Sequence, residues 1–236
     1  MQGKFVRTRI DDGVGYIEIA KPKANTYDLE MMHEVDSALE EFRFDESAKV
    51  IVLTSALPGF FSAGADIEML KKSHPDFKAM FCLFCQETLN KFAQTPKVVI
   101  AALPGHTVGG GLEIALACDL RIMAKDSGKI GLPEVNLGVL PGTGGTQRLP
   151  RLIGTSRALD LMITGRLLTP DEALTIGLVN YVYPRESFAR DVQAFASALA
   201  HGPSRAIGLI KRSVQEGVEM PLSAGLALER ELQNRL

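Results

Sequence analysis

Pro104-Gly105-His106-Thr107-Val108-Gly109-Gly110-Gly111-Leu112-Glu113 follows the apolar run Val98–Leu103 and opens a helical pattern that continues to Cys118. Three consecutive glycines at a helix start are costly, at roughly 1 kcal/mol each relative to alanine inside a helix. An oxyanion-binding backbone would compensate, because the first N–H groups of a helix have no partner within it. The segment therefore predicts a buried strand that turns into an anion-binding helix start.

Three other segments share this small-residue or glycine-rich character. They are Phe60–Ile67, Ile130–Gly138 and Pro141–Leu149. The first follows a buried strand and leads into a short helix, so its N–H groups either bind a negatively charged oxygen or belong to a plain tight loop. The last is a second glycine-rich helix opening, placed to lie against a ligand or a neighbouring subunit.

Two glutamates in these segments are candidate catalytic groups. Glu113 falls in the first helical turn among apolar residues, where a carboxylate should have a raised pKa. The alternative is an ordinary N-terminal glutamate that the helix dipole favours. Glu134 is the only charged residue between Lys129 and Arg148, so it is either bound to a partner group or functional.

Composition indicates a globular protein with a sizeable core. The 236 residues are 46% hydrophobic with a formal net charge of −2, and no Lys/Arg run suggests a nucleic-acid footprint. No stretch of 18 apolar residues and no signal peptide are visible. We therefore expect neither a nucleic-acid partner nor a membrane span, and a cytoplasmic location.

The remaining chemistry-bearing residues favour structural roles. Cys82 and Cys85 form a lone C-x-x-C inside a helical pattern without a second pair, which predicts ordinary core cysteines and no metal site. His106 lacks a triad partner pattern and is expected to be structural. Arg148 and Arg151 are expected to pair with acids.

Strands alternate with helices over the first 185 residues, which predicts the α/β class. A β-hairpin turns at Asp11-Asp12-Gly13, and Thr169-Pro170-Asp171-Glu172 is a capping box. We expect a core over 1–186 and a helical region over 187–236. Its final leucines keep helical spacing without a C-cap glycine, so we expect the natural chain to continue. Further expected elements are helices over 28–44, 75–92, 143–153 and 156–164 and a strand over 179–183.

The four segments together resemble the crotonase family, the enoyl-CoA hydratase/isomerase superfamily. The resemblance covers essentially the whole chain, and its most specific signatures are F-S-A-G-A-D-I at 61–67, G-G-G-L-E at 109–113 and P-E-V-N-L-G-V-L-P-G-T-G-G-T-Q-R-L at 133–149. It implies a spiral of β-β-α units, C-terminal helices that assemble a homotrimer or a dimer of trimers, and a coenzyme A thioester substrate.

The family's site residues transfer to matching positions. The two backbone N–H groups of the oxyanion hole map onto Ala65 and Gly110, and the two catalytic glutamates map onto Glu113 and Glu134. Gly142 falls at the loop that closes over the reacting carbons. The positions that hold the CoA moiety correspond to Ala24, Ala63, Asp66 and Ile67.

Both acids are present, which points within the family to hydration of trans-2-enoyl-CoA to 3-hydroxyacyl-CoA in acyl-CoA degradation. No cofactor is implied beyond the CoA of the substrate. Another crotonase reaction, double-bond isomerisation or thioester hydrolysis, is the near alternative, and an RNA-binding or scaffolding member is the distant one. Pro104-Gly105-His106 departs from the Asn-Gly that many relatives carry, which affects the expected pocket wall.

Overall fold

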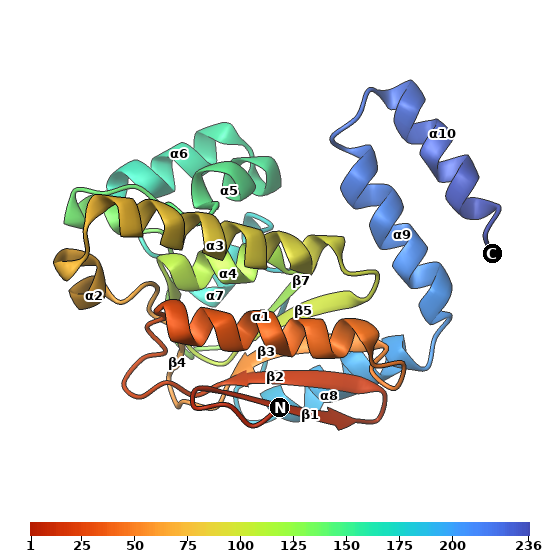
Figure 1. Ribbon diagram of the computed structural model, residues 1–236, viewed down its shortest axis with the longest axis horizontal. Helices are drawn as coiled ribbons and strands as arrows, with labels where there is room; N and C mark the ends of the chain where they lie inside the picture. Colours follow the sequence, from red (N-terminus) through yellow and green to blue (C-terminus); the bar gives the residue numbers. More distant parts are fainter.

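A six-stranded sheet forms the centre of the computed structural model, which describes residues 1–236 (Figure 1). Its strands, in spatial order, are β1 (Val6–Asp11), β2 (Val14–Ile19), β3 (Val50–Ser55), β5 (Val98–Leu103), β7 (Leu120–Ala124) and β9 (Tyr181–Tyr183). β1 pairs with β2 antiparallel and every other pair is parallel. The predicted hairpin is confirmed, with φ of 50° at Asp12 and 78° at Gly13, the left-handed values that a two-residue turn requires.

A second, three-stranded parallel sheet contains β4 (Phe60–Ser62), β6 (His106–Val108) and β8 (Ile130–Gly131), in that order. Each of its strands follows one strand of the large sheet and precedes a helix. The chain thus repeats one unit three times: a large-sheet strand, a small-sheet strand and a helix. The expected α/β class with β-β-α units is confirmed, and the C-terminal part is helical as expected.

The helices agree with most of the expected segments. They are α1 (Leu29–Phe44), α2 (Ile67–Lys72), α3 (Pro75–Gln94), α4 (Gly110–Ala117), the 3-10 helix η1 (Glu134–Leu137), α5 (Gly145–Ile153), α6 (Thr155–Thr164), α7 (Pro170–Thr175), α8 (Phe188–Ala200), α9 (Ser204–Gly217) and α10 (Leu222–Gln233). The predicted capping box of α7 is present, since Thr169 and Glu172 each bond the other's backbone N–H.

Two elements begin two residues later than expected. The helix expected from residue 143 begins at Gly145, because Gly144 has a φ of 115° and the Thr143 N–H bonds a side chain instead of starting the helix. The strand expected from residue 179 begins at Tyr181, because the Val179 N–H bonds the Ala173 carbonyl at the end of α7.

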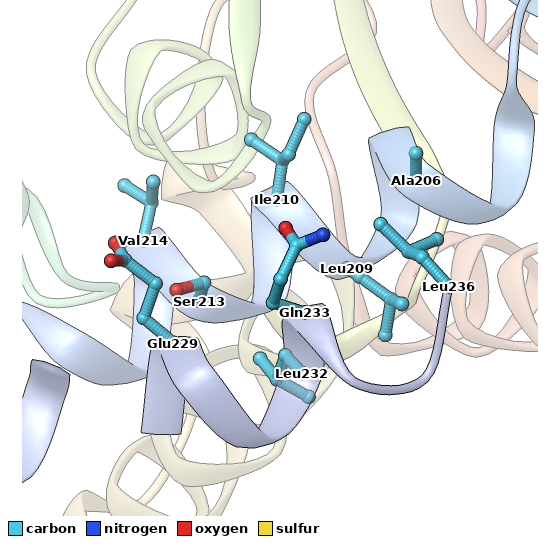
Figure 2. A pocket seen from close by; sticks show the side chains of 9 residues that line it. All are labelled: Ala206, Leu209, Ile210, Ser213, Val214, Glu229, Leu232, Gln233 and Leu236. Atoms are coloured by element: carbon cyan, nitrogen blue, oxygen red, sulfur yellow. The ribbon is translucent and has the colours of Figure 1, made fainter. Parts of the chain in front are cut away.

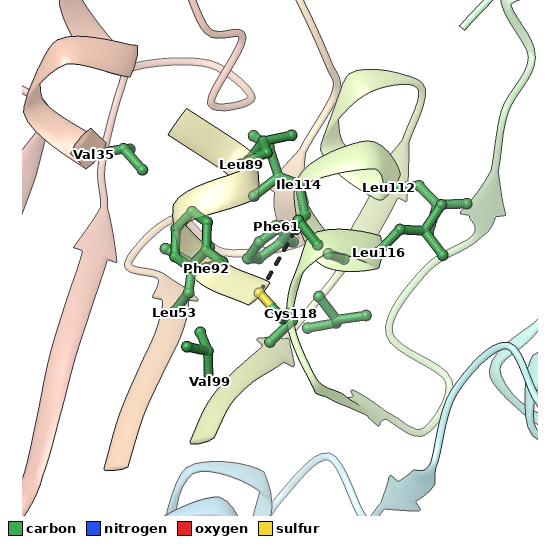
Figure 3. Close-up of a cluster of buried hydrophobic side chains, with 14 of the residues drawn as sticks. Val35, Leu53, Phe61, Leu89, Phe92, Val99, Leu112, Ile114, Leu116 and Cys118 are labelled. Atoms are coloured by element: carbon green, nitrogen blue, oxygen red, sulfur yellow. Dashed lines mark hydrogen bonds between the residues drawn. The ribbon is translucent and has the colours of Figure 1, made fainter. Parts of the chain in front are cut away.

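The large sheet is buried on both faces. Along β3, Ile51 and Leu53 point into the main core, whereas Val50 and Val52 point to the opposite face. The main core lies against helices that include α1, α3 and α4, and Figure 3 shows part of it around Cys118, whose thiol bonds the Ile114 carbonyl at 3.6 Å. Parallel strands covered on both faces read as continuous apolar runs, as this sequence does.

The C-terminal helices divide into two parts. Apolar residues of α8 pack on the second face of the large sheet, although the expected boundary at residue 186 places this helix outside the core. α9 and α10 form a hairpin at the side of the molecule opposite α2 (Figure 1). Between them lies a small, mostly apolar cavity of about 240 Å³ (Figure 2).

The buried ammonium of Lys211 joins α9 to the core. It pairs with Asp119 at 2.7 Å and donates to the carbonyls of Phe92 and Lys97. The lysine and aspartate side chains are only 5% and 13% exposed. These contacts connect α9 to α3 and to the segments that precede β5 and β7.

None of the helices is both long enough and apolar enough to cross a membrane.

Candidate active site

The small sheet brings the predicted segments together. β4, β6 and β8 are adjacent and parallel, so the residues that follow their carboxyl ends emerge at one edge. Ala65 follows β4, Gly110 follows β6 and Glu134 follows β8. A Cβ on Gly64 would lie 2.9 Å from the Gly110 nitrogen, and one on Gly109 would lie 3.1 Å from Glu134 Oε1. Residues far apart in the sequence therefore meet at this edge.

A cavity of about 400 Å³ opens there. Its lining contains seven of the nine residues expected in the site: Ala63, Ala65, Ile67, Gly110, Glu113, Glu134 and Gly142. The other two do not line it. The Ala24 carbonyl accepts the Ala63 N–H at 2.9 Å, and the Asp66 carboxylate caps α2 by accepting the Met69 N–H at 3.0 Å.

Each glycine of the triplet faces a different neighbour. Gly109 has a φ of 57°, and its N–H bonds the Gly131 carbonyl of β8. A Cβ on Gly110 would lie 2.1 Å from the Tyr27 hydroxyl, and one on Gly111 would lie 2.3 Å from the Ser62 carbonyl. The cost of three glycines at a helix start is thus offset by backbone conformation and by close packing of α4 against β4 and against the segment before α1.

The Ala65 and Gly110 N–H groups are free. Neither donates to another group of the protein, although both border the cavity. Gly110 is the first residue of α4, whose initial N–H groups have no helical acceptor. Two unpaired N–H groups at one edge of an apolar cavity suit a negatively charged oxygen.

Glu113 is 2% exposed and tightly held. Its Oε1 accepts the N–H groups of Thr143 and Gly145, both at 2.7 Å. Burial raises the pKa of Glu113 above its ordinary value, while these two hydrogen bonds oppose the shift. A Cβ on Gly145 would lie 3.0 Å from the same oxygen, so a side chain there would crowd the carboxylate.

Glu134 has a different environment at the start of η1. Its Oε2 is buried without any hydrogen-bond partner. Burial raises the pKa of Glu134 to about 7, and the charge of Glu113 adds to the rise. Glu134 is therefore a carboxyl group that changes protonation near neutral pH, with one oxygen free for a ligand.

Tyr27 and Thr143 also line the cavity, and sequence reasoning missed both. The Tyr27 hydroxyl lies 3.2 Å from Thr143 Oγ1, and the Thr143 hydroxyl in turn lowers the pKa of Glu113 by hydrogen bonding. Tyr27 is 1% exposed and its ring lies 6.1 Å from that of Phe81. Tyr27 lies in an irregular stretch before α1. Such a stretch has no hydrophobic periodicity from which a buried position could be predicted.

Several expectations for single residues need correction. Cys85 is buried as expected, but Cys82 is half-buried and lines the cavity. Arg151 pairs with Glu219 at 3.6 Å, whereas Arg148 donates to the Thr143 carbonyl and to Asn90 Oδ1 and pairs with no acid. The acceptors of Arg148 come from another helix and from the loop before its own, so they could not be read from the sequence.

His106 lies outside the cavity lining, as a structural histidine would. Its Nδ1 accepts the Lys129 N–H at 3.1 Å, and its ring lies 5.2 Å from that of Phe60. Both contacts join β6 to its neighbours in the small sheet.

Comparison with known proteins identifies the family. The family model for enoyl-CoA hydratase/isomerase matches residues 9–236. The chain belongs to the enoyl-CoA hydratase/isomerase family. A crystal structure of an enoyl-CoA hydratase from Geobacillus kaustophilus HTA426 is similar, with a TM-score of 0.98 and 52% identity, over 99% of this chain and 89% of that one.

Relatives in this enoyl-CoA hydratase/isomerase family include a probable enoyl-CoA hydratase of Mycobacterium bovis, 40% identical over 94% of this chain and 85% of the relative. A short-chain-enoyl-CoA hydratase of Clostridium acetobutylicum is 35% identical over 92% of this chain and 84% of its own length. The chain is therefore an enzyme of crotonase type, with an acyl-CoA as the substrate class that the family implies.

Proposed function

We propose that this enzyme hydrates trans-2-enoyl-CoA thioesters to 3-hydroxyacyl-CoA in acyl-CoA degradation. The observation that carries the proposal is the pair of glutamates, Glu113 and Glu134, lining one cavity with two free backbone N–H groups. The hydratase relatives support it. The proposed reaction uses only these groups and water, so it needs no metal or redox cofactor.

The N–H groups of Ala65 and Gly110 bind the thioester oxygen in this proposal. Addition of water at C3 moves the double-bond electrons toward the carbonyl, so negative charge develops on that oxygen. Donors aimed at the charge stabilise it, and loss of one donor typically costs ~10²–10³ in rate. Gly142 and Ile67 border the same cavity and contact the thioester, while Ala24, Ala63 and Asp66 support the backbone beside the CoA moiety.

The different environments of the two acids suggest different roles. Glu113 accepts two N–H bonds, which favour its ionised form, so it takes a proton from the attacking water. Glu134, with its pKa raised to about 7, carries a proton at and below neutral pH and delivers it to C2. One proton and one hydroxide are added across C2=C3, and the proton left on Glu113 returns to Glu134 through solvent.

Two isosteric variants test the assignment. Glu113→Gln and Glu134→Gln should each reduce hydration of crotonyl-CoA by at least about a hundredfold, measured as loss of the conjugated-thioester absorbance. Glu186→Gln, at an exposed residue of the loop before α8, serves as the matched control. A wild-type-like rate in either site variant refutes the two-glutamate mechanism. Turnover of 3-enoyl-CoA without hydration of 2-enoyl-CoA favours isomerisation instead.

We also propose that the C-terminal helices assemble a homotrimer or a dimer of trimers. Large apolar side chains on α9 and after it are exposed, among them Ile210 at 62% and Val218 at 72%. Exposed apolar surface of this kind marks an interaction site. Light scattering after gel filtration measures the assembly, and a monomer at micromolar concentration would contradict it. A cytoplasmic location stays a prediction.

A further inference from the structure

Lys78 is the only cation that lines the active-site cavity, and the proposed hydration gives it no role. It lies in the first turns of α3 and is half-buried. Its backbone N–H bonds the His74 carbonyl at 3.1 Å, but its ammonium forms no ion pair and no hydrogen bond within the chain. Three donors at the wall of a mostly apolar cavity therefore have no protein partner.

The ammonium does not serve as the counterion of the acid that titrates near neutral pH. Glu134 forms no ion pair with Lys78, and its buried Oε2 has no hydrogen-bond partner at all. The Lys78 ammonium therefore makes no contact with that oxygen. A cation in this position can bind a ligand group without disturbing the proposed acid.

The position of Lys78 on α3 relates it to the reacting carbons. Lys78, Phe81 and Cys82 lie on one face of the helix, and all three border the cavity. Cys82 packs near Gly142, whose Cβ would lie 3.6 Å from its sulfur, beside the loop that holds Glu113. Lys78 lies one turn before Cys82, about 6 Å along the helix axis. Lys78 and the loop at Gly142 therefore border the same cavity along one face of α3.

We propose that Lys78 binds the terminal carboxylate of a short dicarboxylic enoyl-CoA, so that trans-2-enedioyl thioesters such as glutaconyl-CoA are substrates of this site. The surroundings favour a carboxylate over the phosphates of CoA. A single ammonium among apolar groups such as Phe81 and Leu70 matches one carboxylate, whereas a pyrophosphate needs several donors or cations, and none besides Lys78 lines this cavity. This inference rests on the proposed hydratase function.

The test compares two substrates of equal chain length, glutaconyl-CoA and trans-2-pentenoyl-CoA, which differ in a carboxylate or a methyl group at C5. Lys78→Met removes the charge and keeps the apolar stem. The ratio of kcat/KM values, glutaconyl to pentenoyl, should fall at least about tenfold in this variant. Lys78→Arg keeps the charge and should retain most of the preference. Lys72→Met, at an exposed lysine that ends α2 outside the cavity, should leave the ratio unchanged.

Two results overturn the proposal. An unchanged ratio in Lys78→Met shows that no carboxylate is recognised, and an equal loss on both substrates places Lys78 against the shared CoA portion. Lys78→Gln is a second neutral variant in case the methionine variant fails to fold. Calorimetric titration with the saturated glutaryl-CoA and valeryl-CoA measures the same preference without turnover. A third result would separate the two proposals. If the wild type hydrates neither enoyl thioester but still binds glutaryl-CoA more tightly than valeryl-CoA, the hydratase proposal is refuted and the carboxylate site is not.

Discussion

Glu134→Gln should stabilise the folded protein at alkaline pH and not at acid pH. Glu134 has a pKa of about 7 in the folded chain because it is buried, against 4.5 for an ordinary glutamate. Below pH 4.5 the carboxyl group is protonated in both the folded and the unfolded chain, so its burial does not reduce the free energy of unfolding through ionisation. Between these values the unfolded chain loses the proton while the folded chain keeps it, so stability falls as pH rises and the full penalty is present above pH 7.

The size of the effect follows from the shift. A change from 4.5 to about 7 corresponds to at most ~3.4 kcal/mol at ~1.36 kcal/mol for each pKa unit. Glu134 is only partly buried, and solvent screening reduces this value to about 1–2 kcal/mol. The glutamine variant should therefore gain about 1–2 kcal/mol relative to wild type between pH 5 and pH 8. Any cost of burying the amide is the same at both pH values and cancels in this difference.

Urea denaturation at pH 5 and pH 8 measures the free energy of unfolding of both proteins, with equal m-values as the condition for comparison. Glu186→Gln provides the control, because Glu186 is exposed and forms no ion pair. If the glutamine variant gains as much unfolding free energy at pH 5 as at pH 8, or more at pH 5, the argument that Glu134 is held as a protonated acid is refuted.

Three other changes have expected outcomes. Gly110→Ala should lower crotonyl-CoA hydration at least about a hundredfold, because its Cβ would lie 2.1 Å from the Tyr27 hydroxyl and displace the N–H; a near-normal rate contradicts this. Thr143→Val removes a hydroxyl that lowers the pKa of Glu113, so the acid limb of the kcat/KM profile should move to higher pH, whereas Thr143→Ser should leave it in place. Lys211→Met leaves a carboxylate without its buried partner and should cost about 3–5 kcal/mol of unfolding free energy, measured in urea; a loss below 1 kcal/mol would show that α9 does not depend on this pair.

Most of the large sheet could be predicted from the sequence because five of its six strands contain five or six residues and show a pattern. Val50–Leu53 and Val98–Leu103 are continuous apolar runs, and the structure buries them on both faces. The small sheet could not be predicted. Its strands contain two or three residues, such as Ile130–Gly131, and fall inside the glycine-rich and small-residue segments. A strand of two residues has no periodicity to detect.

The same limit applies to the site. Sequence reasoning selected Glu113 and Glu134 because an acid in an apolar stretch is conspicuous, and the structure places both at one cavity. It missed Tyr27, whose role depends on a neighbour 116 residues away in the chain. It also missed that Lys78 borders the cavity, since an isolated lysine in a helix is usually a solvent-facing residue.

The glycine-rich segments were expected to bring backbone N–H groups close to a ligand. In the structure their glycines share a second role, which is close packing within the protein. The space beside these glycines is filled by other groups of the protein and not by a ligand. Gly110 and Gly111 admit Tyr27 and Ser62, and Gly145 admits the carboxylate of Glu113. Because the protein packs this closely around them, the Gly110 N–H and the glutamate are held by several elements at once. Substitution of these glycines should therefore damage the geometry of the site through the protein's own packing, and at Gly110 it should also displace the N–H that binds the thioester oxygen in the proposed mechanism.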